Sequence, residues 1–389
     1  MVVLIGFISL TVLDYIQIKD RKKHNVKLSI IVFTIILLFA VGIGGRIDFR
    51  QSNNLQHTIH DGALQTEVAA DLLRQGKNPY HENFSNTVLG QVYGKDNVIM
   101  EHYIYLPFYL LTSSAVQSVN NALWDNYDQR ILLLLAFFVS LVIMYKIPSK
   151  LDTKLLAVTI FAFNPIFIRN FIFGHNEIFV FVLILGSIYL LSKKHFGWSL
   201  VVIGLALASK QLAWPILPFY FLYLYMNIDQ TQKLTTSRFL VTLKKLWPTV
   251  LVFLAVIMPF VIWSPVDFFN DVYRYPTGGL ATSFPIQGVG FSQLMLSSGL
   301  IKSATAYFPF WIIQIIIGLS LMWWLLKKQV LNNNISFLLT SYMLLALAVL
   351  MFGRYFNEPF IAYFSMLAIA AWAFKDNAGS METEPQQTP

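Results

Sequence analysis

The sequence predicts an all-α fold, that of a polytopic integral membrane protein with about 10–12 transmembrane helices. Of its 389 residues, 56% are hydrophobic and 12% are charged, whereas a soluble domain carries about 25% charged residues. The apolar residues form runs of membrane length, and basic residues form short segments between them. Together these observations predict a helical bundle in a bilayer, with a first outer loop that carries amphipathic surface helices.

Helices are expected where apolar runs approach the ~20 residues needed to cross a hydrocarbon core of ~30 Å. The first run is followed rather than preceded by basic residues, so it is expected to remain as a membrane helix and not to be cleaved as a signal. The runs 198–208 and 212–226 could form one broken unit. The apolar runs are Val2–Ile18, Leu28–Ile43, Tyr103–Val119, Ile131–Ile147, Leu155–Phe173, Ile178–Leu191, Trp198–Ala208, Leu212–Met226, Trp247–Trp263, Ala306–Leu326, Ile335–Phe352 and Phe360–Phe374.

Basic residues favour the cytoplasmic ends of membrane helices and so orient the chain. The long polar loops 45–102 and 264–305 are then expected outside. The alternation fails once, because two runs separate the outer His102 from the inner Lys146: one run must be re-entrant or lie on the surface, or Lys146 is not inside. The predicted inner segments are Lys19–Lys27, Lys146–Lys154, Lys193–His195, Lys233–Lys245 and Lys327–Lys328.

Residues 1–375 are expected to form one transmembrane domain, and the polar tail 376–389 is expected to be disordered. The net charge of +8 reflects loop orientation and not nucleic-acid binding, because aromatic residues do not interleave with the basic ones. The absence of cysteine excludes disulfides and thiol chemistry. No Gly-rich nucleotide loop and no Ser-His-Asp pattern occurs in the sequence.

The polar segment between the second and third apolar runs contains the first candidate site residue. Asp61, in His60-Asp61-Gly62, precedes an amphipathic segment, 63–75, that Gly76 and Pro79 are expected to end. Asp61 could cap this helix by accepting its free N–H groups, or it could act as a general base. Because a capping carboxylate is stabilised as the anion, a catalytic Asp61 would have to point partly away from the helix.

Two further polar groups interrupt apolar runs. Asn164-Pro165 breaks one run, and Gly174-His175-Asn176-Glu177 follows it. Polar residues near membrane depth are costly and tend to be functional, although a hydrated turn at a helix end would also explain them. Two side chains, His175 and Glu177, are too few to indicate a metal site.

Several charged residues near helix ends are candidates for contact with an anionic substrate. Lys210, followed by Gln211, could snorkel to the surface or bind a phosphate. Arg274, in the second outer loop, could clamp a phosphate or anchor the interface. Arg354 and Glu358 could touch substrate, although an i,i+4 ion pair between them is the default interpretation.

The order of these motifs resembles the GT-C superfamily of polyprenyl-phosphate-sugar-dependent glycosyltransferases. His60-Asp61-Gly62, with residues 76–80 and Tyr105-Leu106-Pro107, looks like the polyprenol-dependent mannosyltransferases of bacteria and mycobacteria. Asn164-Pro165 with Gly174-His175-Asn176, and the stretch 204–211 with Pro215, also look like the endoplasmic-reticulum dolichyl-phosphate-glucose glucosyltransferases. The resemblance covers roughly residues 45–220. Leu106-Pro107 departs from it, since relatives often have two prolines there.

The resemblance implies a GT-C-like bundle and an inverting hexosyltransferase, mannose being the favoured sugar. The donor would be a polyprenyl-phosphate-linked sugar and the acceptor a hydroxyl of a lipid-linked or cell-envelope glycan, with Asp61 as general base. Lys210, Arg274 or Arg354 would supply charge for the leaving phosphate. The implied substrate-binding residues are His60, Glu101, His102, Asn164, His175, Asn176, Glu177, Lys210, Gln211, Arg274, Arg354 and Glu358.

The resemblance further implies no metal, no cofactor and no nucleic-acid partner, and an active site on the extracytoplasmic face of the cell membrane, among membrane lipids. The alternative from another class is a transporter or flippase of a lipid-linked or anionic solute. Transporters place charged groups at the bilayer midplane, often in repeated halves, and no repeated halves are visible here. A non-enzymatic scaffold is the third interpretation.

Overall fold

The computed structural model describes residues 2–16, 20–53, 55–93, 101–124, 126–227 and 236–381. Helices dominate the described chain, which confirms the all-α prediction, and the only described strands are the two-residue β1 (Gln287–Gly288) and β2 (Tyr355–Phe356). The α-helices are α1 (Val2–Tyr15), α2 (Asp20–Phe39), α3 (Gly45–Asn53), α4 (Asp61–Arg74), α5 (Val88–Tyr93), α6 (Pro107–Trp124), α7 (Arg130–Lys146), α8 (Leu151–Ala162), α9 (Pro165–Phe173), α10 (Glu177–Ser192), α11 (Phe196–Leu207), α12 (Leu217–Asn227), α13 (Thr236–Lys245), α14 (Trp247–Trp263), α15 (Pro265–Phe269), α16 (Tyr275–Thr277), α17 (Phe291–Ser297), α18 (Phe310–Leu331), α19 (Ile335–Met351) and α20 (Glu358–Met381).

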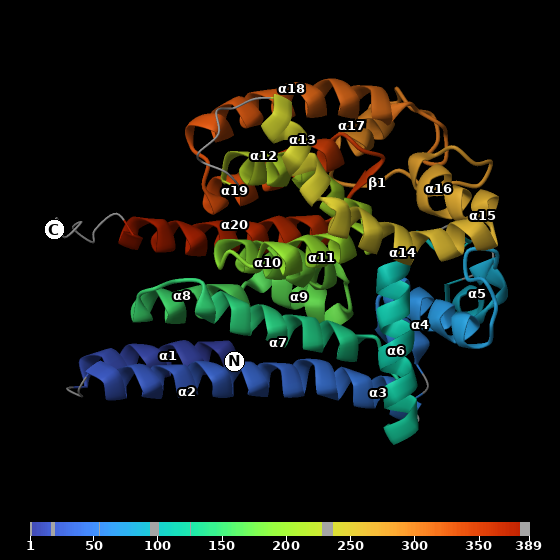
Figure 1. Cartoon of the computed structure of the whole chain (residues 1–389). Helices are drawn as coiled ribbons and strands as arrows, with labels where there is room; N and C mark the ends of the chain where they lie inside the picture. The colour runs from blue at the N-terminus through green and yellow to red at the C-terminus, as the bar shows by residue number, and fades with distance from the viewer. Residues whose placement is uncertain are drawn as a thin grey trace.

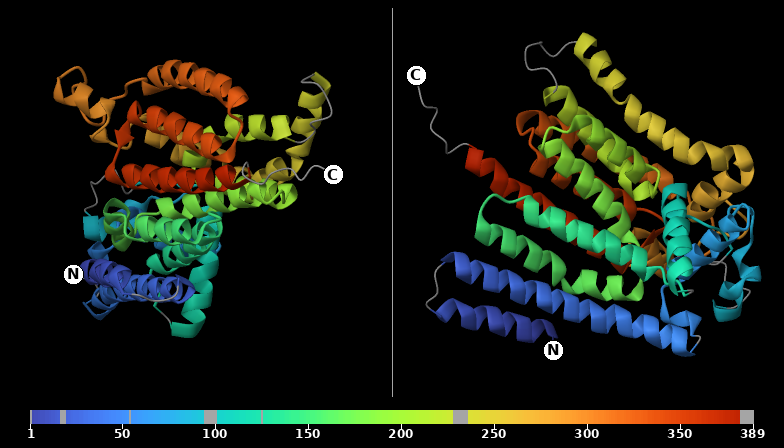
Figure 2. Two further views of the ribbon diagram at one scale, coloured as in Figure 1. Left: turned by 90° about the vertical axis from the view of Figure 1, so that its left-hand side faces the viewer. Right: turned by 60° about the horizontal axis from the view of Figure 1, so that its bottom comes forward.

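The long helices lie side by side, and one helix crosses their ends (Figure 1). Four long helices have roughly parallel axes in Figure 1: α2, α7, α10 and α20. The axis of α6 stands nearly across them, and Figure 2 shows the same arrangement from two other directions. We call the end that holds α4, α5, α15 and α16 the loop end. We call the opposite end, where α2 begins with its basic residues and α7 ends at Lys146, the basic end.

The position of α6 bears on the one failure of the predicted alternation. Most of the apolar run 103–119 lies in α6. This helix lies along the loop end, across the ends of the long helices, and does not run the length of the bundle. α7 alone then leads from the loop end to Lys146. α6 suits this place because its buried face is polar from Ser113 onward: Ser113 donates to Gln129 (2.6 Å), and Gln117 donates to Asp71 (3.0 Å).

By length and composition, two described helices are able to cross a membrane: the continuous helix 20–53, which contains α2 and α3, and α18. Counting each of two bent pairs, α8 with α9 and α13 with α14, as one span raises the number to four. α1, α10, α11 and α19 are apolar but shorter. This is fewer than the predicted 10–12, because prolines and polar turns divide runs that are continuous in hydrophobicity.

Two of these breaks lie at sequence motifs. Asn164 caps α9 and Pro165 begins it, and the chain bends by 49° between α8 and α9. The runs 198–208 and 212–226 form α11 and α12, separated by a 3-10 helix, Gln211–Ile216, that begins after Lys210. Both motifs therefore place polar groups at interruptions of apolar helices.

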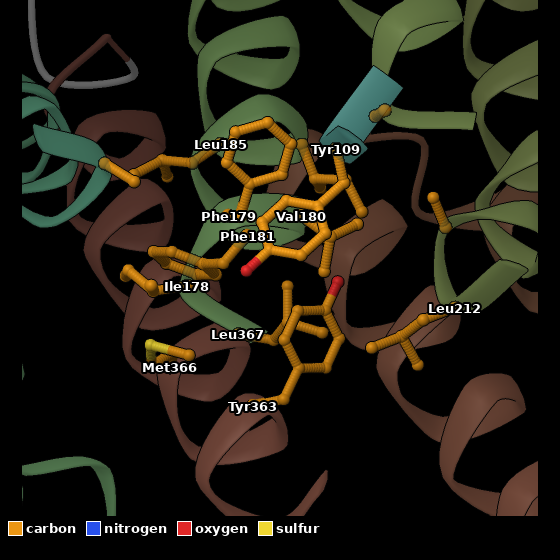
Figure 3. Packing of buried hydrophobic residues seen from close by; sticks show 14 of the residues in the cluster. Tyr109, Ile178, Phe179, Val180, Phe181, Leu185, Leu212, Tyr363, Met366 and Leu367 are labelled. Atoms are coloured by element: carbon orange, nitrogen blue, oxygen red, sulfur yellow. The ribbon is translucent and has the colours of Figure 1, made fainter. Parts of the chain in front are cut away.

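The main core extends through the bundle from α2 to α20, and Figure 3 shows its part between α10 and α20, which reaches α6 and the turn before α12. Phe181 and Leu185 of α10 face Tyr363 and Leu367 of α20 across this core. The Tyr342 hydroxyl donates to the Leu212 carbonyl at 2.8 Å and accepts from the Tyr363 hydroxyl at 2.6 Å, so both buried phenols are hydrogen-bonded. Packing on this core fixes the first residue of α10, Glu177, at the loop end.

A cluster of buried charges, which we call the buried ion network, holds α4 at the loop end. Arg50 donates to both oxygens of Glu67 (2.9 and 2.6 Å) and to Asp128 (2.8 Å). Arg130 donates to both Asp128 oxygens, at 2.8 Å each. The backbone N–H of Gln129 donates to Glu67 at 2.7 Å. Residues from α3, α4, α7 and the segment before α7 are thereby locked together.

Two expectations about polar segments need correction. α4 is not a helix resting on the surface, because Gln65, Thr66 and Glu67 are buried along with its apolar residues. α20 continues to Met381, so helical structure extends beyond residue 375, where the tail was expected to begin. Residues 382–389 lie outside the described part of the chain.

Candidate active site

The site is built on the N-terminus of α4. His60 is the N-cap residue and Asp61 is the first residue of the helix. The Gly62 N–H donates to Nδ1 of His60 (3.2 Å) and to Oδ1 of Asp61 (2.6 Å). Capping is therefore shared, and Asp61 is not the N-cap that the sequence allowed it to be. Gly76, with φ of 75°, follows the end of the helix, as its sequence signal predicts.

The Asp61 carboxylate is held through one oxygen. Nε2 of His60 lies 3.0 Å from Oδ1 of Asp61. Nδ1 of His60 faces the Gly62 N–H, so Nε2 is the nitrogen that donates to Asp61. Burial alone would raise the pKa of Asp61, but His60 and the Gly62 N–H outweigh it, and the pKa lies below its usual value. Asp61 is thus an anion whose side chain is still 30% exposed.

Gly62 is required by a close approach of Tyr105. A Cβ atom at this position would lie 2.2 Å from the Tyr105 hydroxyl, closer than any real contact. Tyr80 holds Tyr105 in turn, because its hydroxyl donates to the Tyr105 carbonyl at 2.8 Å. The structure thereby joins the three pieces of the first motif: His60-Asp61-Gly62, the segment ending at Tyr80, and Tyr105.

The turn between α9 and α10 lies against His60. Gly174 has φ of 102° and ends α9, and the His60 N–H donates to the Phe173 carbonyl at 2.9 Å. The rings of His60 and His175 are 3.8 Å apart. Burial, together with the neighbouring His60, lowers the pKa of His175 to about 3. His175 is therefore a neutral imidazole that can donate or accept a hydrogen bond but carries no charge.

Lys210 joins the second motif to the third. Its ammonium donates to Asn176 (2.8 Å) and to Oε1 of Glu177 (2.7 Å) and lies over the Tyr105 and Phe360 rings. The Lys210 side chain is 16% exposed, so it does not snorkel to the surface. Oε2 of Glu177 is buried and has no hydrogen-bond partner among the described residues. An acceptor atom is therefore left for a hydroxyl or a water.

These side chains face one pocket, which the second outer loop covers. The pocket measures about 110 Å³. β1 pairs in parallel with β2, Gln287 opposite Tyr355, and this short ladder brings the amides of Gln287 and Asn357 to the pocket. Sequence reasoning missed both amides, because a two-residue strand has no periodic signal. The pocket is lined by His60, Asp61, Gly62, Gln65, Ile104, Tyr105, His175, Glu177, Lys210, Phe284, Gln287, Tyr355, Asn357, Pro359 and Phe360.

A larger apolar cleft of about 380 Å³ adjoins this pocket. Tyr105, Lys210 and Phe360 line both. Beyond them the cleft runs between the second outer loop and α18 and α19, where Trp214, Trp311 and several aliphatic side chains form its walls. A polar compartment with charged groups thus opens beside an apolar one.

Two His–Asp pairs fasten the outer loops together. Nδ1 of His102 lies 2.5 Å from Asp271, whose other oxygen accepts the Tyr103 N–H at 3.0 Å. Burial raises the pKa of Asp271 to about 6. At the surface, Nδ1 of His81 lies 2.6 Å from Asp267. The sequence singled out His102 as a substrate contact, but the structure uses it to hold Asp271, which the sequence analysis did not single out.

Other predicted site residues have structural partners. Asn164 caps α9 and donates to Ser365 at 2.6 Å. Gln211 donates to the backbone carbonyl of Val272 at 3.0 Å, and it lines the apolar cleft. Glu101 accepts the Phe84 N–H through its backbone carbonyl. None of these three side chains lines the polar pocket.

The charged candidates late in the chain are also engaged with protein. Arg354 is buried, lines the apolar cleft and donates to the carbonyls of Phe284, Ala304 and Ala306, which ties the second outer loop down. It does not pair with Glu358, the default interpretation, because Glu358 pairs with Arg169 at 3.1 Å. Arg274 is exposed and donates to Asn270 and Gly279.

Within the described ranges, no group of three or more His, Asp or Glu side chains is arranged to hold a metal ion. His175 and Glu177, the pair that the sequence offered, face His60 and Lys210 instead. What the pocket can do chemically follows from its own groups: two carboxylates, an ammonium, two imidazoles and three amides. These suit proton transfer from a hydroxyl beside a bound anion.

Fold and pocket together describe a helical protein with helices able to cross a membrane and a polar pocket at one end of an apolar bundle. Residues 68–226 match the family described as alpha-(1->6)-mannopyranosyltransferase, N-terminal domain, a mannosyltransferase family of the GT-C type, and the protein is a glycosyltransferase. The match includes His175, Glu177 and Lys210 and begins just after Asp61. No curated protein and no solved structure matches the chain.

Proposed function

We propose that the protein transfers mannose, with inversion, from a polyprenyl-phosphate donor to a hydroxyl of a lipid-linked or cell-envelope glycan. The observation that carries this proposal is that the Asp61 carboxylate and the Lys210 ammonium line one pocket, beside an apolar cleft. A transferase of this kind needs a base for the acceptor hydroxyl, a cation for the phosphate and an apolar path for the lipid. The match to a mannosyltransferase family favours mannose.

Asp61 would act as the general base. The acceptor oxygen forms a bond to the anomeric carbon while the bond from that carbon to the phosphate oxygen breaks. The electron pair leaves with the phosphate, and the hydroxyl proton passes to Asp61. With Oδ1 held by His60 and Gly62, Oδ2 is the atom left to accept this proton. A base of low pKa can serve here, because the hydroxyl becomes acidic only as the new bond forms.

Lys210 would stabilise the charge of the leaving phosphate. Two of its donors are held by Asn176 and Glu177, which leaves one N–H for a ligand. A cation in a site shielded from water stabilises a developing anion more than it would in bulk solvent. No protonated acid is needed for this step, because phosphate leaves as an anion, and the neutral His175 fits that requirement.

The apolar cleft would accommodate the first part of the polyprenyl chain. Its walls include Trp214 and Trp311, and it opens directly from the Lys210 end of the polar pocket. A phosphate at Lys210 would therefore continue into the cleft as an isoprenoid chain. A nucleotide donor has no long apolar chain that would fill this cleft.

The pocket would face the outside of the cell membrane. It lies at the loop end, and the basic residues that begin α2 lie at the opposite end (Figure 1). Basic residues favour the cytoplasmic side. Counting the two bent pairs and the four shorter apolar helices with the two long ones gives eight candidate spans among the described residues, which supports a polytopic protein.

A transporter is the weaker alternative, since the charged pocket lies at one end of the bundle and not at its middle. The test gives purified full-length protein radiolabelled mannose on polyprenyl phosphate, or on guanosine diphosphate, together with membrane lipid extract. We expect label to enter a new product from the lipid donor alone. Transfer from the nucleotide donor, or movement of the lipid donor across vesicle bilayers without transfer, would overturn the proposal.

A further inference from the structure

A third pocket, a groove between α1 and α2, lies away from the polar pocket. It measures about 470 Å³ and shares no residue with the polar pocket or the apolar cleft. α1 and α2 lie side by side at the edge of the bundle (Figures 1 and 2). The groove is lined by Ile5, Gly6, Ser9, Lys22, Asn25, Val26, Ser29, Ile30, Phe33, Thr34 and Leu37.

The groove changes from polar to apolar along α2. Its lining residues recur every three or four positions, so they share one face of the helix. Lys22, Asn25 and Ser29 come first, and Phe33 and Leu37 follow toward the middle of the helix. At 1.5 Å per residue, the face from Lys22 to Leu37 is about 22 Å long. A ligand that fits it has a polar, charged head and an apolar tail.

The charge of Lys22 is not neutralised by the described chain. Lys23 and Lys27 both pair with Asp14, at 3.3 and 2.6 Å. No described carboxylate pairs with Lys22, which is exposed at the mouth of the groove. The only charge that lines the groove is therefore positive, and the complementary head is an anion.

The groove opens away from the protein core. The opposite face of α2 packs inward, with His24, Ile31 and Ile35 buried and Nε2 of His24 3.4 Å from the Tyr145 hydroxyl. Phe33 in the groove is 66% exposed. The continuous helix 20–53 is long and apolar enough to cross a bilayer, so the surroundings of this face are lipid.

We infer that this groove binds one anionic phospholipid of the membrane that surrounds the protein. Its phosphate lies against the Lys22 ammonium and the Asn25 amide, and one acyl chain lies along Ile30, Phe33 and Leu37. This site is separate from the donor lipid of the proposed function, because its lining begins where α2 begins, at the basic end, and the polar pocket is lined by residues at the loop end.

The test titrates the purified full-length protein in detergent with dioleoyl phosphatidylglycerol or dioleoyl phosphatidylcholine and counts bound lipid by native mass spectrometry. We expect one phosphatidylglycerol to bind more tightly than the rest. Lys22→Gln should weaken that binding about fivefold, the contribution of one basic residue facing an anionic headgroup. Ser29→Phe, which fills the groove, should remove the tight phosphatidylglycerol site.

Arg21→Gln is the matched control, because Arg21 is a neighbouring exposed cation that does not line the groove. Equal losses of phosphatidylglycerol binding in Lys22→Gln and Arg21→Gln would mean diffuse attraction to a basic surface and would overturn the proposed site. Equal binding of both lipids by the wild type, unchanged by Ser29→Phe, would overturn it as well.

Discussion

Two clusters of charged side chains share α4, and they differ in whether all of their polar atoms have hydrogen-bond partners within the protein. In the buried ion network, each carboxylate of Glu67 and Asp128 accepts hydrogen bonds at both oxygens, and the charged side chains are at most 9% exposed. In the polar pocket, Asp61 is 30% exposed and Oε2 of Glu177 has no described partner. One cluster is saturated by the protein, and the other keeps free atoms that a ligand can use.

The difference has a physical reason. A buried charge is tolerated only when partners and hydrogen bonds offset its desolvation. The network meets this condition internally, so it can only support the fold. The pocket does not meet it, so its free groups reduce stability unless water or substrate satisfies them. Local violations of this kind are typical of functional sites.

The largest expected effect on stability is at Asp128. Asp128→Ala would leave the buried Arg130 without its carboxylate, and breaking a buried pair in this way costs about 3–5 kcal/mol. Unfolding of the detergent-solubilised variant, followed by temperature or denaturant, measures this loss. Asp152→Ala, at an exposed aspartate in α8, should change little. A loss at Asp128 as small as that at Asp152 would show that the network is not what holds α4.

Variants at Lys210 can separate a structural role, measured as stability, from a role in the transfer reaction. Lys210→Met removes the cation from the pocket and leaves Glu177 buried without its partner, so both stability and transfer should fall, stability by about 3 kcal/mol. Adding Glu177→Gln removes the stranded charge and should recover most of the stability but not the transfer. Unfolding and transfer assays on the wild type, the two single variants and the double variant form a double-mutant cycle. Recovery of transfer along with stability would make Lys210 purely structural.

Gly62 tests the close packing around Asp61. Gly62→Ala drives a Cβ atom into the Tyr105 hydroxyl and should cost about 1–3 kcal/mol, as overpacking does. Combining it with Tyr105→Phe removes the clashing oxygen and should restore part of the loss. Melting temperatures of the three variants report this. If the double variant is no more stable than Gly62→Ala, the approach of Tyr105 is not the reason for glycine.

The smallest expected effect is at the exposed pair of His81 and Asp267. The hydrogen bond to Asp267 raises the pKa of His81 above its usual value. Such a pair stabilises the folded protein fully below the unfolded histidine pKa of about 6.5, and the contribution disappears as the pH rises through the raised folded value. His81→Gln should therefore flatten the melting temperature above pH 6.5. An unchanged pH profile would mean that the pair contributes nothing.

The sequence predicted the parts of the site that depend on local signals. Asp61 at the start of a helix, Gly76 after its end and the break at Pro165 all follow from capping and proline rules. The meeting of Asp61, His175 and Lys210 was available only through the order of motifs that the resemblance supplied. The number of membrane-spanning helices was harder to predict, because hydropathy does not show where polar turns divide an apolar run into shorter helices.

The sequence could not predict contacts between distant segments. Glu67 reads as a solvent-facing charge on an amphipathic helix, and its partner Arg50 lies in another helix. His102 and Arg354 looked available for substrate, yet Asp271 and three backbone carbonyls occupy them. In each case the deciding partner lies far along the chain, and local patterns carry no information about it.

The central claim is that Asp61 is the base of the glycosyl transfer. Its most direct test is the transfer rate of Asp61→Asn relative to Asp71→Asn, a change of the same kind on α4 outside the pocket. Both proteins would be given radiolabelled mannosyl polyprenyl phosphate and acceptor lipid extract, after matched melting temperatures show that both are folded. We expect Asp61→Asn to lose about 10²–10⁴-fold in rate and Asp71→Asn to match the wild type. A folded Asp61→Asn protein that transfers mannose at the wild-type rate would contradict the account.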